Sequence, residues 1–97
     1  MRYPFIKQND DTEIVFSEPK PDGDVLVFFE RWDDDIDNFD SMTVSLKDQK
    51  EYDVVGFSDD EVREKKEFVL NMTPLIYRFS KQGGIGERAE DIFNKRL

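Results

Sequence analysis

The chain has 97 residues, with 23 Asp and Glu against 14 Lys and Arg, and a formal net charge of −9. This length gives one domain with a small core. The negative charge argues against direct binding to nucleic acid or to an anionic membrane, because phosphate would repel the chain. The aromatic content is 13%, including nine Phe, which favours a folded domain over a disordered chain.

Cysteine and histidine are both absent from the sequence. Their absence removes disulfides, thiolate nucleophiles, the commonest general base and the usual zinc ligands. We therefore predict a protein without catalytic residues, resident metal or cofactor. The first ten residues lack the apolar core of a signal peptide, and no apolar run is long enough to cross a membrane. We expect a cytoplasmic protein with no membrane partner.

The first half of the chain carries the signals of β-strands. Residues 1–11 are mostly polar, and we expect them to form a flexible arm. Strands are predicted where apolar residues alternate or cluster between turn residues. The predicted strands cover residues 13–16, 24–31, 42–47 and 52–57, with 24–31 central because both its faces are apolar.

The spacing of apolar residues becomes helical after residue 58. Ser58 and Glu61 match a capping box at the start of a helix. Pro74 predicts either a kink in this helix or a new helix with Thr73 as its cap and Pro74 at its first position. The predicted buried stripe of the first helix is Val62, Val69 and Met72. Lys65 and Lys66 interrupt it, so either their stems snorkel or this turn of the helix is only half covered.

Two glycines at residues 83–84 predict the end of the second helix. A last short helix is predicted from the spacing of Ile85, Ala89, Ile92 and Phe93. Because the strands precede the helices, the fold class is α+β. We predict a single domain over residues 1–97, with a four-stranded, mostly antiparallel meander sheet followed by two or three C-terminal helices packed on one face.

Charge is distributed unevenly along the chain. Residues 1–61 carry 18 acidic and 6 basic side chains, whereas residues 62–97 carry 5 acidic and 8 basic ones. The sheet half is therefore anionic and favours a basic partner. We expect the basic side chains of the second half to pair with the acidic half rather than to bind RNA.

The sharpest local feature is the segment 32–40, in which residues 33–40 hold five carboxylates and no cation. We predict an acidic loop whose apolar residues anchor a basic protein surface and whose carboxylates attract it. The predicted partner-binding residues are Trp32, Asp33, Asp34, Asp35, Ile36, Asp37, Phe39 and Asp40.

Other interpretations of the local motifs stay open. The acidic segment is either simply solvated or a weak divalent-cation site, since Asp33, Asp35 and Asp37 match the first ligands of an EF-hand loop. Asn38 and Val44 stand where that loop needs Gly and Glu. The glycines of residues 83–86 resemble a phosphate-binding turn, but this turn follows a predicted helix rather than a strand.

These features favour a non-catalytic acidic module that docks onto or neutralises a basic protein, such as one that acts on nucleic acid. Immunity proteins, antitoxins and other inhibitors work in this way, and the analogy rests on size, charge and missing catalytic residues. One alternative is a homodimer formed through an exposed sheet edge or the Phe-rich strand surface. Another is an enzyme that uses paired carboxylates or carboxylate-bound Mg²⁺.

Overall fold

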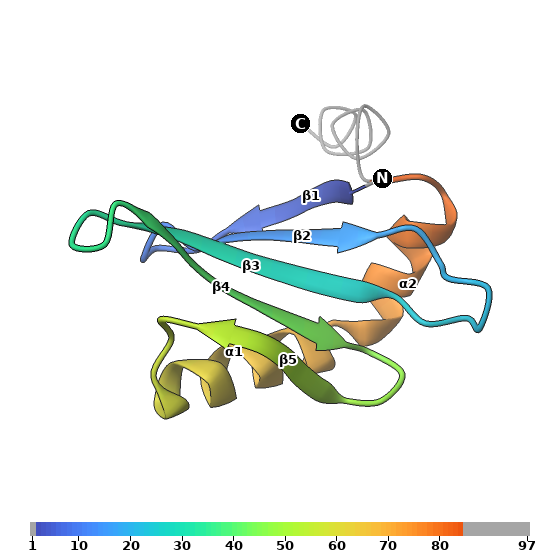
Figure 1. The fold of residues 1–97 in the computed structure, drawn as a ribbon. Helices are drawn as coiled ribbons and strands as arrows, with labels where there is room; N and C mark the ends of the chain where they lie inside the picture. The colour runs from blue at the N-terminus through green and yellow to red at the C-terminus, as the bar shows by residue number, and fades with distance from the viewer. Residues whose placement is uncertain (1, 85–97) are drawn as a thin grey trace.

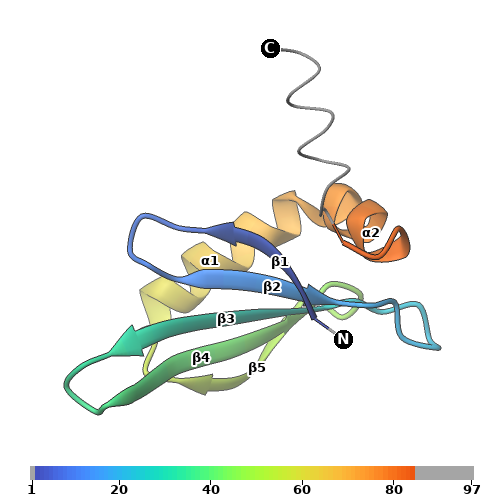
Figure 2. The ribbon, with the colours of Figure 1, turned by 90° about the horizontal axis from the view of Figure 1, so that it is seen from above.

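A five-stranded antiparallel sheet and two helices make up the computed structural model, which describes residues 2–84 (Figure 1). The strands lie in chain order across the sheet, and each pairs antiparallel with the next. Both helices lie on the same face of the sheet (Figures 1 and 2). The elements are β1 (Arg2–Lys7), β2 (Glu13–Ser17), β3 (Leu26–Asp33), β4 (Asn38–Ser45), β5 (Lys50–Val55), α1 (Asp59–Asn71) and α2 (Thr73–Lys81).

The predicted α+β class and meander order are confirmed, but the predicted number of four strands is wrong. The additional strand is β1, in the segment expected to form a flexible arm. It pairs with β2 along its length, with an irregularity between Pro4 and Ile6. Tyr3 and Phe5 pack against the core. Pro4 and the charged residues Arg2 and Lys7 weaken the strand pattern of this segment in the sequence. An edge strand tolerates proline because one side of its backbone needs no partner.

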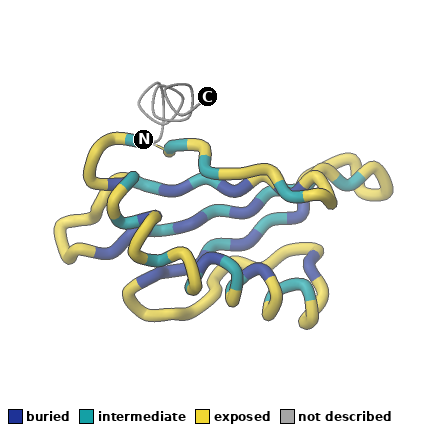
Figure 3. Tube along the Cα trace, turned by 180° about the vertical axis from the view of Figure 1, so that it is seen from behind, coloured by how far each residue is buried: buried dark blue, intermediate teal, exposed yellow. Residues whose placement is uncertain are grey.

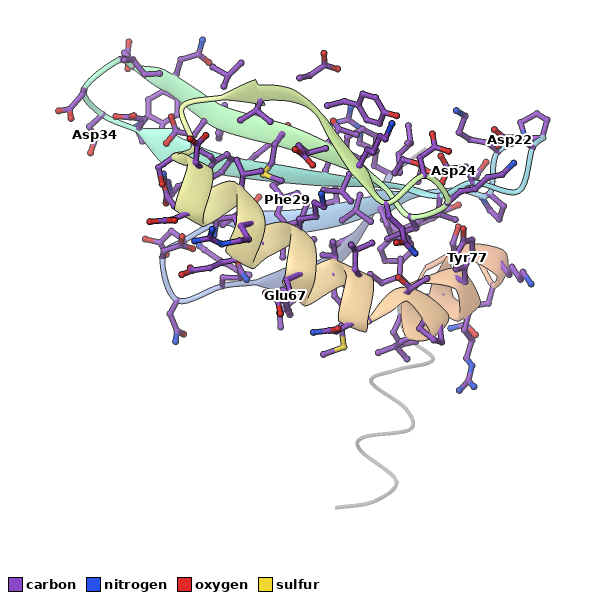
Figure 4. The ribbon with its side chains drawn as sticks, turned by 90° about the horizontal axis from the view of Figure 1, so that it is seen from below. Asp22, Asp24, Phe29, Asp34, Glu67 and Tyr77 are labelled. Carbon is purple, nitrogen blue, oxygen red and sulfur yellow. The ribbon has the colours of Figure 1, made fainter. Side chains whose placement is uncertain are left out.

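The core lies between the helices and one face of the sheet. Successive side chains of a strand point to opposite faces, so alternate residues of β2, β3 and β4 are buried beneath the helices (Figure 3). β3 is the central strand, as its apolar faces predict, and its residue Phe29 points toward the helices (Figure 4). The buried apolar residues are Ile14, Phe16, Val25, Val27, Phe29, Met42, Val44, Leu46, Phe57, Val69 and Ile76.

Three of the predicted strands have shifted boundaries. The strand predicted at 24–31 is observed at 26–33, the one at 42–47 is at 38–45, and the one at 52–57 is at 50–55. Asp24 precedes β3, where its buried carboxylate accepts hydrogen bonds from the Ser45 hydroxyl at 2.6 Å and the Lys47 amide at 3.0 Å. These bonds fasten the β4–β5 turn, at the end of the sheet opposite Asp34 (Figure 4).

α1 begins with the predicted capping box. The Ser58 hydroxyl accepts a hydrogen bond from the Glu61 amide, and the Glu61 carboxylate accepts one from the Ser58 amide. Val69 is fully buried, as the predicted stripe requires. Met72 is exposed instead, because it is the C-cap at which the chain turns out of α1.

α2 is the new helix of the two alternatives that Pro74 predicts. Met72 rather than Thr73 stands at its cap, and the Thr73 hydroxyl bonds back to the last turn of α1. The buried Ser80 donates a hydrogen bond to the Ser17 carbonyl at 2.7 Å, which ties α2 to the end of β2.

The predicted end of the second helix is confirmed. α2 ends at Lys81, and Gly83 and Gly84 follow with φ angles of 81° and 105°. Residues with a Cβ rarely adopt this region, so the two glycines allow the chain to leave the helix. The last helix, predicted from Ile85, Ala89, Ile92 and Phe93, lies outside the described residues.

Candidate functional site

The acidic segment 32–40 forms the end of a β-hairpin, two strand ends and a short turn, rather than a long loop. β3 and β4 stay paired out to Asp33 and Asn38, so only residues 34–37 remain as a turn. Asp33 Oδ1 accepts a hydrogen bond from the Asp35 amide at 3.0 Å. Asp37 has φ of 50°, a left-handed conformation that Asp and Asn adopt more readily than most residues. The acidic composition suggested a loop because Asp is uncommon in strands.

Two aromatic side chains stand beside this turn on the outer face of the sheet, opposite the helices. Trp32 and Phe39 are a cross-strand pair, with ring centroids 5.2 Å apart in an edge-to-face arrangement. They remain 49% and 46% exposed. The indole Nε1 of Trp32 donates a hydrogen bond to Asp34 at 2.6 Å, which orients the ring. A rigid aromatic pair that is half exposed is typical of an anchor in protein recognition.

Four carboxylates at this end of the hairpin have no cation of their own in the described part of the chain; three of them are exposed and Asp33 is half-buried. Within residues 2–84, no Lys or Arg forms an ion pair with Asp33, Asp34, Asp35 or Asp37. Ile36, between them at the turn, is also exposed. Beside the turn is a shallow hollow of about 370 Å³, lined by Arg31, Trp32, Asp33, Asp34, Asp35 and Asp40. The turn therefore presents unneutralised negative charge next to apolar surface.

Asp40, the fifth carboxylate of the segment, faces the helices and is only 2% exposed. Its Oδ2 accepts hydrogen bonds from Nε and Nη2 of Arg31, its partner in register on β3, at 3.2 and 3.0 Å. The alternation of side chains along β4 places Phe39 outside and Asp40 inside. Asp40 is therefore part of the framework of the hairpin and is not accessible as a contact residue.

The backbone after β5 also packs closely on Asp40. Gly56 has φ of 84°, and a Cβ at this position would lie 1.9 Å from Asp40 Oδ1. Only glycine combines this φ with such a close approach. Arg31 thus bonds one oxygen of the Asp40 carboxylate, and the Gly56 backbone covers the other, which has no hydrogen-bond partner among the described residues.

Arg31 is the centre of an ion network that the sequence did not reveal. Its Nη1 bonds Asp10 at 3.3 Å and Glu61 at 2.5 Å. Lys65 Nζ donates to Asp10 at 2.9 Å and to Gln8 at 2.8 Å. We define the Arg31 network as the five charged residues Asp10, Arg31, Asp40, Glu61 and Lys65. It joins the β1–β2 turn, β3, β4 and α1.

The signal for this network in the sequence is a cation at a position where the apolar pattern expects a core residue. Arg31 continues the inward-facing positions of β3. Lys65 interrupts the buried stripe of α1, and it is buried rather than snorkelling to solvent. Both cations lie over the ring of Phe57, at 4.7 Å for the Arg31 guanidinium carbon and 5.6 Å for Lys65 Nζ.

The network shifts the pKa values of its members. Burial disfavours the charge of Asp10, but hydrogen bonds, chiefly from Lys65, hold its pKa well below the usual range. The hydrogen bond from Arg31 lowers the pKa of Glu61, and that same bond raises the pKa of Arg31 against the effect of burial. Asp10, Glu61 and Arg31 are therefore all charged at neutral pH and act as structural ions.

Residues 2–84 contain no group of three or more carboxylates placed to hold a metal ion. The weak divalent-cation interpretation of Asp33, Asp35 and Asp37 thus has no ligand cluster in this part of the chain. The first two glycines of residues 83–86 terminate α2, and the backbone at Gly84 packs against the ring of Tyr3.

None of the helices described between residues 2 and 84 is long and apolar enough to cross a membrane. Comparison of the chain with protein-family models, with curated proteins and with solved structures found no match. Function is therefore inferred from the surface chemistry of the hairpin.

Proposed function

We propose that this protein is a non-catalytic acidic module that docks onto a basic protein through the hairpin tip. The observation that carries the proposal is the half-exposed aromatic pair at the end of a hairpin whose turn carries exposed carboxylates that form no ion pair within residues 2–84. The hairpin tip is defined as Trp32, Asp33, Asp34, Asp35, Ile36, Asp37 and Phe39. Asp40, predicted as a contact, is left out because it is buried.

The two kinds of side chain would contribute differently to binding. A buried aromatic anchor commonly contributes about 2 kcal/mol or more, measured as the cost of truncating it to Ala. Each exposed carboxylate adds roughly 0.2–1 kcal/mol, but together they steer a basic partner and suppress acidic ones. The partner that fits is a surface rich in Lys and Arg, such as the phosphate-binding surface of a nucleic-acid-acting protein, with carboxylates in place of phosphates.

The test uses two variants with the same change of charge. The tip variant carries Asp33→Asn, Asp34→Asn, Asp35→Asn and Asp37→Asn. Asn keeps the oxygen that accepts from Trp32 and suits the left-handed conformation of Asp37. The control variant changes four exposed carboxylates elsewhere, namely Asp11→Asn, Asp53→Asn, Glu64→Gln and Glu67→Gln.

Wild type and both variants would be tagged and used to capture partners from the native cell extract, after circular dichroism has shown that all three are folded. A captured basic protein would then be purified and titrated by calorimetry. We expect the tip variant to bind at least about tenfold more weakly, and the control to stay within roughly threefold of wild type. Equal weakening in both variants, or in neither, contradicts a site at the hairpin tip.

Self-association through β5 is a second candidate, favoured by a different observation. All six residues of this edge strand are exposed, among them the apolar Tyr52, Val54 and Val55. Exposed strand edges can pair with a second copy. Sedimentation velocity at low micromolar concentration tests this candidate. A dimer that is lost in Val55→Lys supports it, and monomers of both proteins exclude it.

A further inference from the structure

The outer face of the sheet, opposite α1 and α2, has no helix over it within residues 2–84 (Figure 2). A row of uncharged side chains crosses this face, with one residue from each strand, because residues paired in register share a face. The row is about 20 Å long, since neighbouring strands lie about 4.8 Å apart. None of its members is fully buried. We define the outer row as Pro4, Val15, Phe28, Thr43 and Tyr52.

The outer row is continuous with the hairpin tip along β3. Phe28, Glu30 and Trp32 are successive outward positions of this strand, about 6.6 Å apart at 3.3 Å per residue. A stable protein–protein interface takes about 20–30 residues from each side, whereas the hairpin tip has seven. A partner bound to the tip must therefore extend over further surface, and the outer face is the surface that adjoins the tip.

A pair of carboxylates lies between the outer row and the aromatic pair of the tip. Glu13 on β2 and Glu30 on β3 are directly opposite each other, an arrangement in which like charges repel. Arg2 contacts Glu30 at 3.7 Å. Lys7 is the neighbour of Glu13 in register on β1, but it contacts Asp11 instead, at 3.8 Å. Glu13 is exposed and forms no ion pair within residues 2–84, so it is the carboxylate of this pair that can accept a cation from a partner.

The chain itself shows which kind of side chain this face accepts. The guanidinium carbon of Arg2 lies 3.7 Å from the centre of the Phe28 ring, and Nη1 of Arg2 contacts Glu30. The cation is thus held by a ring and a carboxylate together. Trp32 with Asp34 repeats this combination of ring and carboxylate at the tip, where no cation of residues 2–84 occupies it.

We propose that the basic partner docks on the hairpin tip and the outer face together, through an amphipathic helix that lies along β3. Residues four apart on a helix are separated by about 6 Å along its axis, close to the spacing of outward positions on a strand. Each turn of the helix therefore meets one outward position of β3.

The surface alternates in chemistry along this line, and so does the helix that fits it. Apolar side chains of the helix cover the outer row and the aromatic pair of the tip. Basic side chains on the intervening turns meet Glu13 and the carboxylates of residues 34–37. This proposal rests on the proposed function and deepens it, because it names the segment that the basic partner supplies.

Two synthetic peptides of about 18 residues, long enough to form a helix, test the proposal. The Leu–Arg peptide carries Leu and Arg on alternate turns of one face and Ala elsewhere. The Ala–Arg peptide has Ala in place of each Leu and the same charge. Each is titrated into the full chain labelled with ¹⁵N, and the amide signals are followed by NMR.

We expect the Leu–Arg peptide to shift the amide signals of the hairpin tip and of residues 13–15 and 28–30. The Ala–Arg peptide should shift those of the tip alone and bind at least about tenfold more weakly, because it buries less apolar surface. The signals of α1 and α2 should stay unchanged with both peptides.

Two protein variants locate the contact. The face variant, Val15→Thr with Phe28→Thr, removes apolar surface from the outer row and keeps residues that suit a strand. The helix control, Met72→Ala with Leu75→Ala, removes two exposed apolar side chains from the helical side. With both proteins shown to be folded by circular dichroism, the face variant should bind the Leu–Arg peptide about tenfold more weakly than wild type. The helix control should bind it as wild type does.

Shifts confined to the tip with both peptides overturn this proposal and leave the proposed function standing. Absence of shifts with both peptides overturns the two together. An affinity for the Leu–Arg peptide that is the same in the face variant and in wild type also overturns the role of the outer row. If the face variant does not fold, the comparison of the two peptides on wild type decides, since it needs no substitution in the protein.

Discussion

The hairpin tip and the Arg31 network draw carboxylates from the same acidic stretch of sequence and place them in opposite environments. Asp40 faces the helices, where it is buried against Arg31. Asp34, which lies before it in the same hairpin, stays in solvent with no cation within ion-pairing distance among residues 2–84. The alternation of side chains along β4 turns Asp40 toward the helices, whereas Asp34 belongs to the exposed turn. The buried carboxylate here is held in an ion network of the fold, and the exposed ones are those that we propose meet a partner.

The largest loss of stability is expected for Arg31→Ala, which removes the central cation of the Arg31 network. It leaves the buried Asp40 without its cation and removes one partner each from Asp10 and Glu61. Removing one member of a buried ion pair costs about 3–5 kcal/mol. We expect the free energy of unfolding, measured in urea, to fall by about 3 kcal/mol, since Arg31 retains some solvent contact. A loss below about 1 kcal/mol would mean that the network contributes little to the fold.

Gly56→Ala tests the packing of Asp40 from the other side. The substitution forces a Cβ into a left-handed conformation and against Asp40 Oδ1, and we expect a loss of about 2–3 kcal/mol. Gly23→Ala is the matched control, because Gly23 has φ of 87° and no atom near the added Cβ. It should lose only the conformational part, about 1 kcal/mol. Equal losses at the two glycines would show that contact with Asp40 does not matter.

A smaller loss of stability is expected at acid pH, where the carboxylates of the Arg31 network become protonated. The pKa values of Asp10 and Glu61 are lowered in the folded state from ordinary values of 3.8 and 4.5, so the unfolded chain binds protons first. Their contribution is present above about pH 4.5 and is lost as the pH falls below that value. The expected loss is on the order of 1 kcal/mol, since the Asp10 side chain is 42% exposed and partly screened. Urea midpoints at pH 7, 5 and 3 measure it.

A double variant provides the control for the acid effect. Asp10→Asn with Glu61→Gln should be less stable than wild type at pH 7 and should show a shallower decline between pH 5 and 3. An unchanged decline would assign the acid sensitivity to other carboxylates.

The smallest effect is expected at the hairpin tip. The four Asp→Asn changes of the tip variant should alter the free energy of unfolding by no more than about 0.5 kcal/mol, because no ion pair among residues 2–84 is lost. Asp40→Asn makes the same chemical change at a buried site and should cost about 1.5–3 kcal/mol. A tip variant as unstable as Asp40→Asn would remove the distinction between the two environments.

Periodicity predicted the class of this fold well, because strands and helices that bury one face leave a regular apolar pattern. The central strand and the capping box of Ser58 and Glu61 followed from local residues alone. β1 was missed because an edge strand needs only a weak pattern and tolerates Pro4. The exposed aromatic residues Trp32 and Phe39 stood out in the sequence as apolar residues among carboxylates, but their cross-strand pairing could not be predicted.

The Arg31 network could not be predicted from the sequence for a different reason. Its members come from segments far apart in the chain, and only the tertiary fold brings Asp10 to Lys65 and Arg31 to Glu61. The burial of Asp40 depends on how far the hairpin extends. The acidic composition predicted a long loop, and in a loop side chains do not alternate between a buried and an exposed face. The misplaced ends of β3 and β4 therefore also gave Asp40 its predicted role as a contact.

The most direct test of the central claim is to titrate the captured basic partner into wild type, the tip variant and the control variant side by side. All three proteins should unfold at nearly the same urea concentration. We predict that the tip variant alone binds the partner about tenfold or more weakly, while the control, with the same net charge, keeps the affinity of wild type. Equal affinity of the tip variant and wild type, with all proteins folded, would contradict the division between structural and recognition carboxylates.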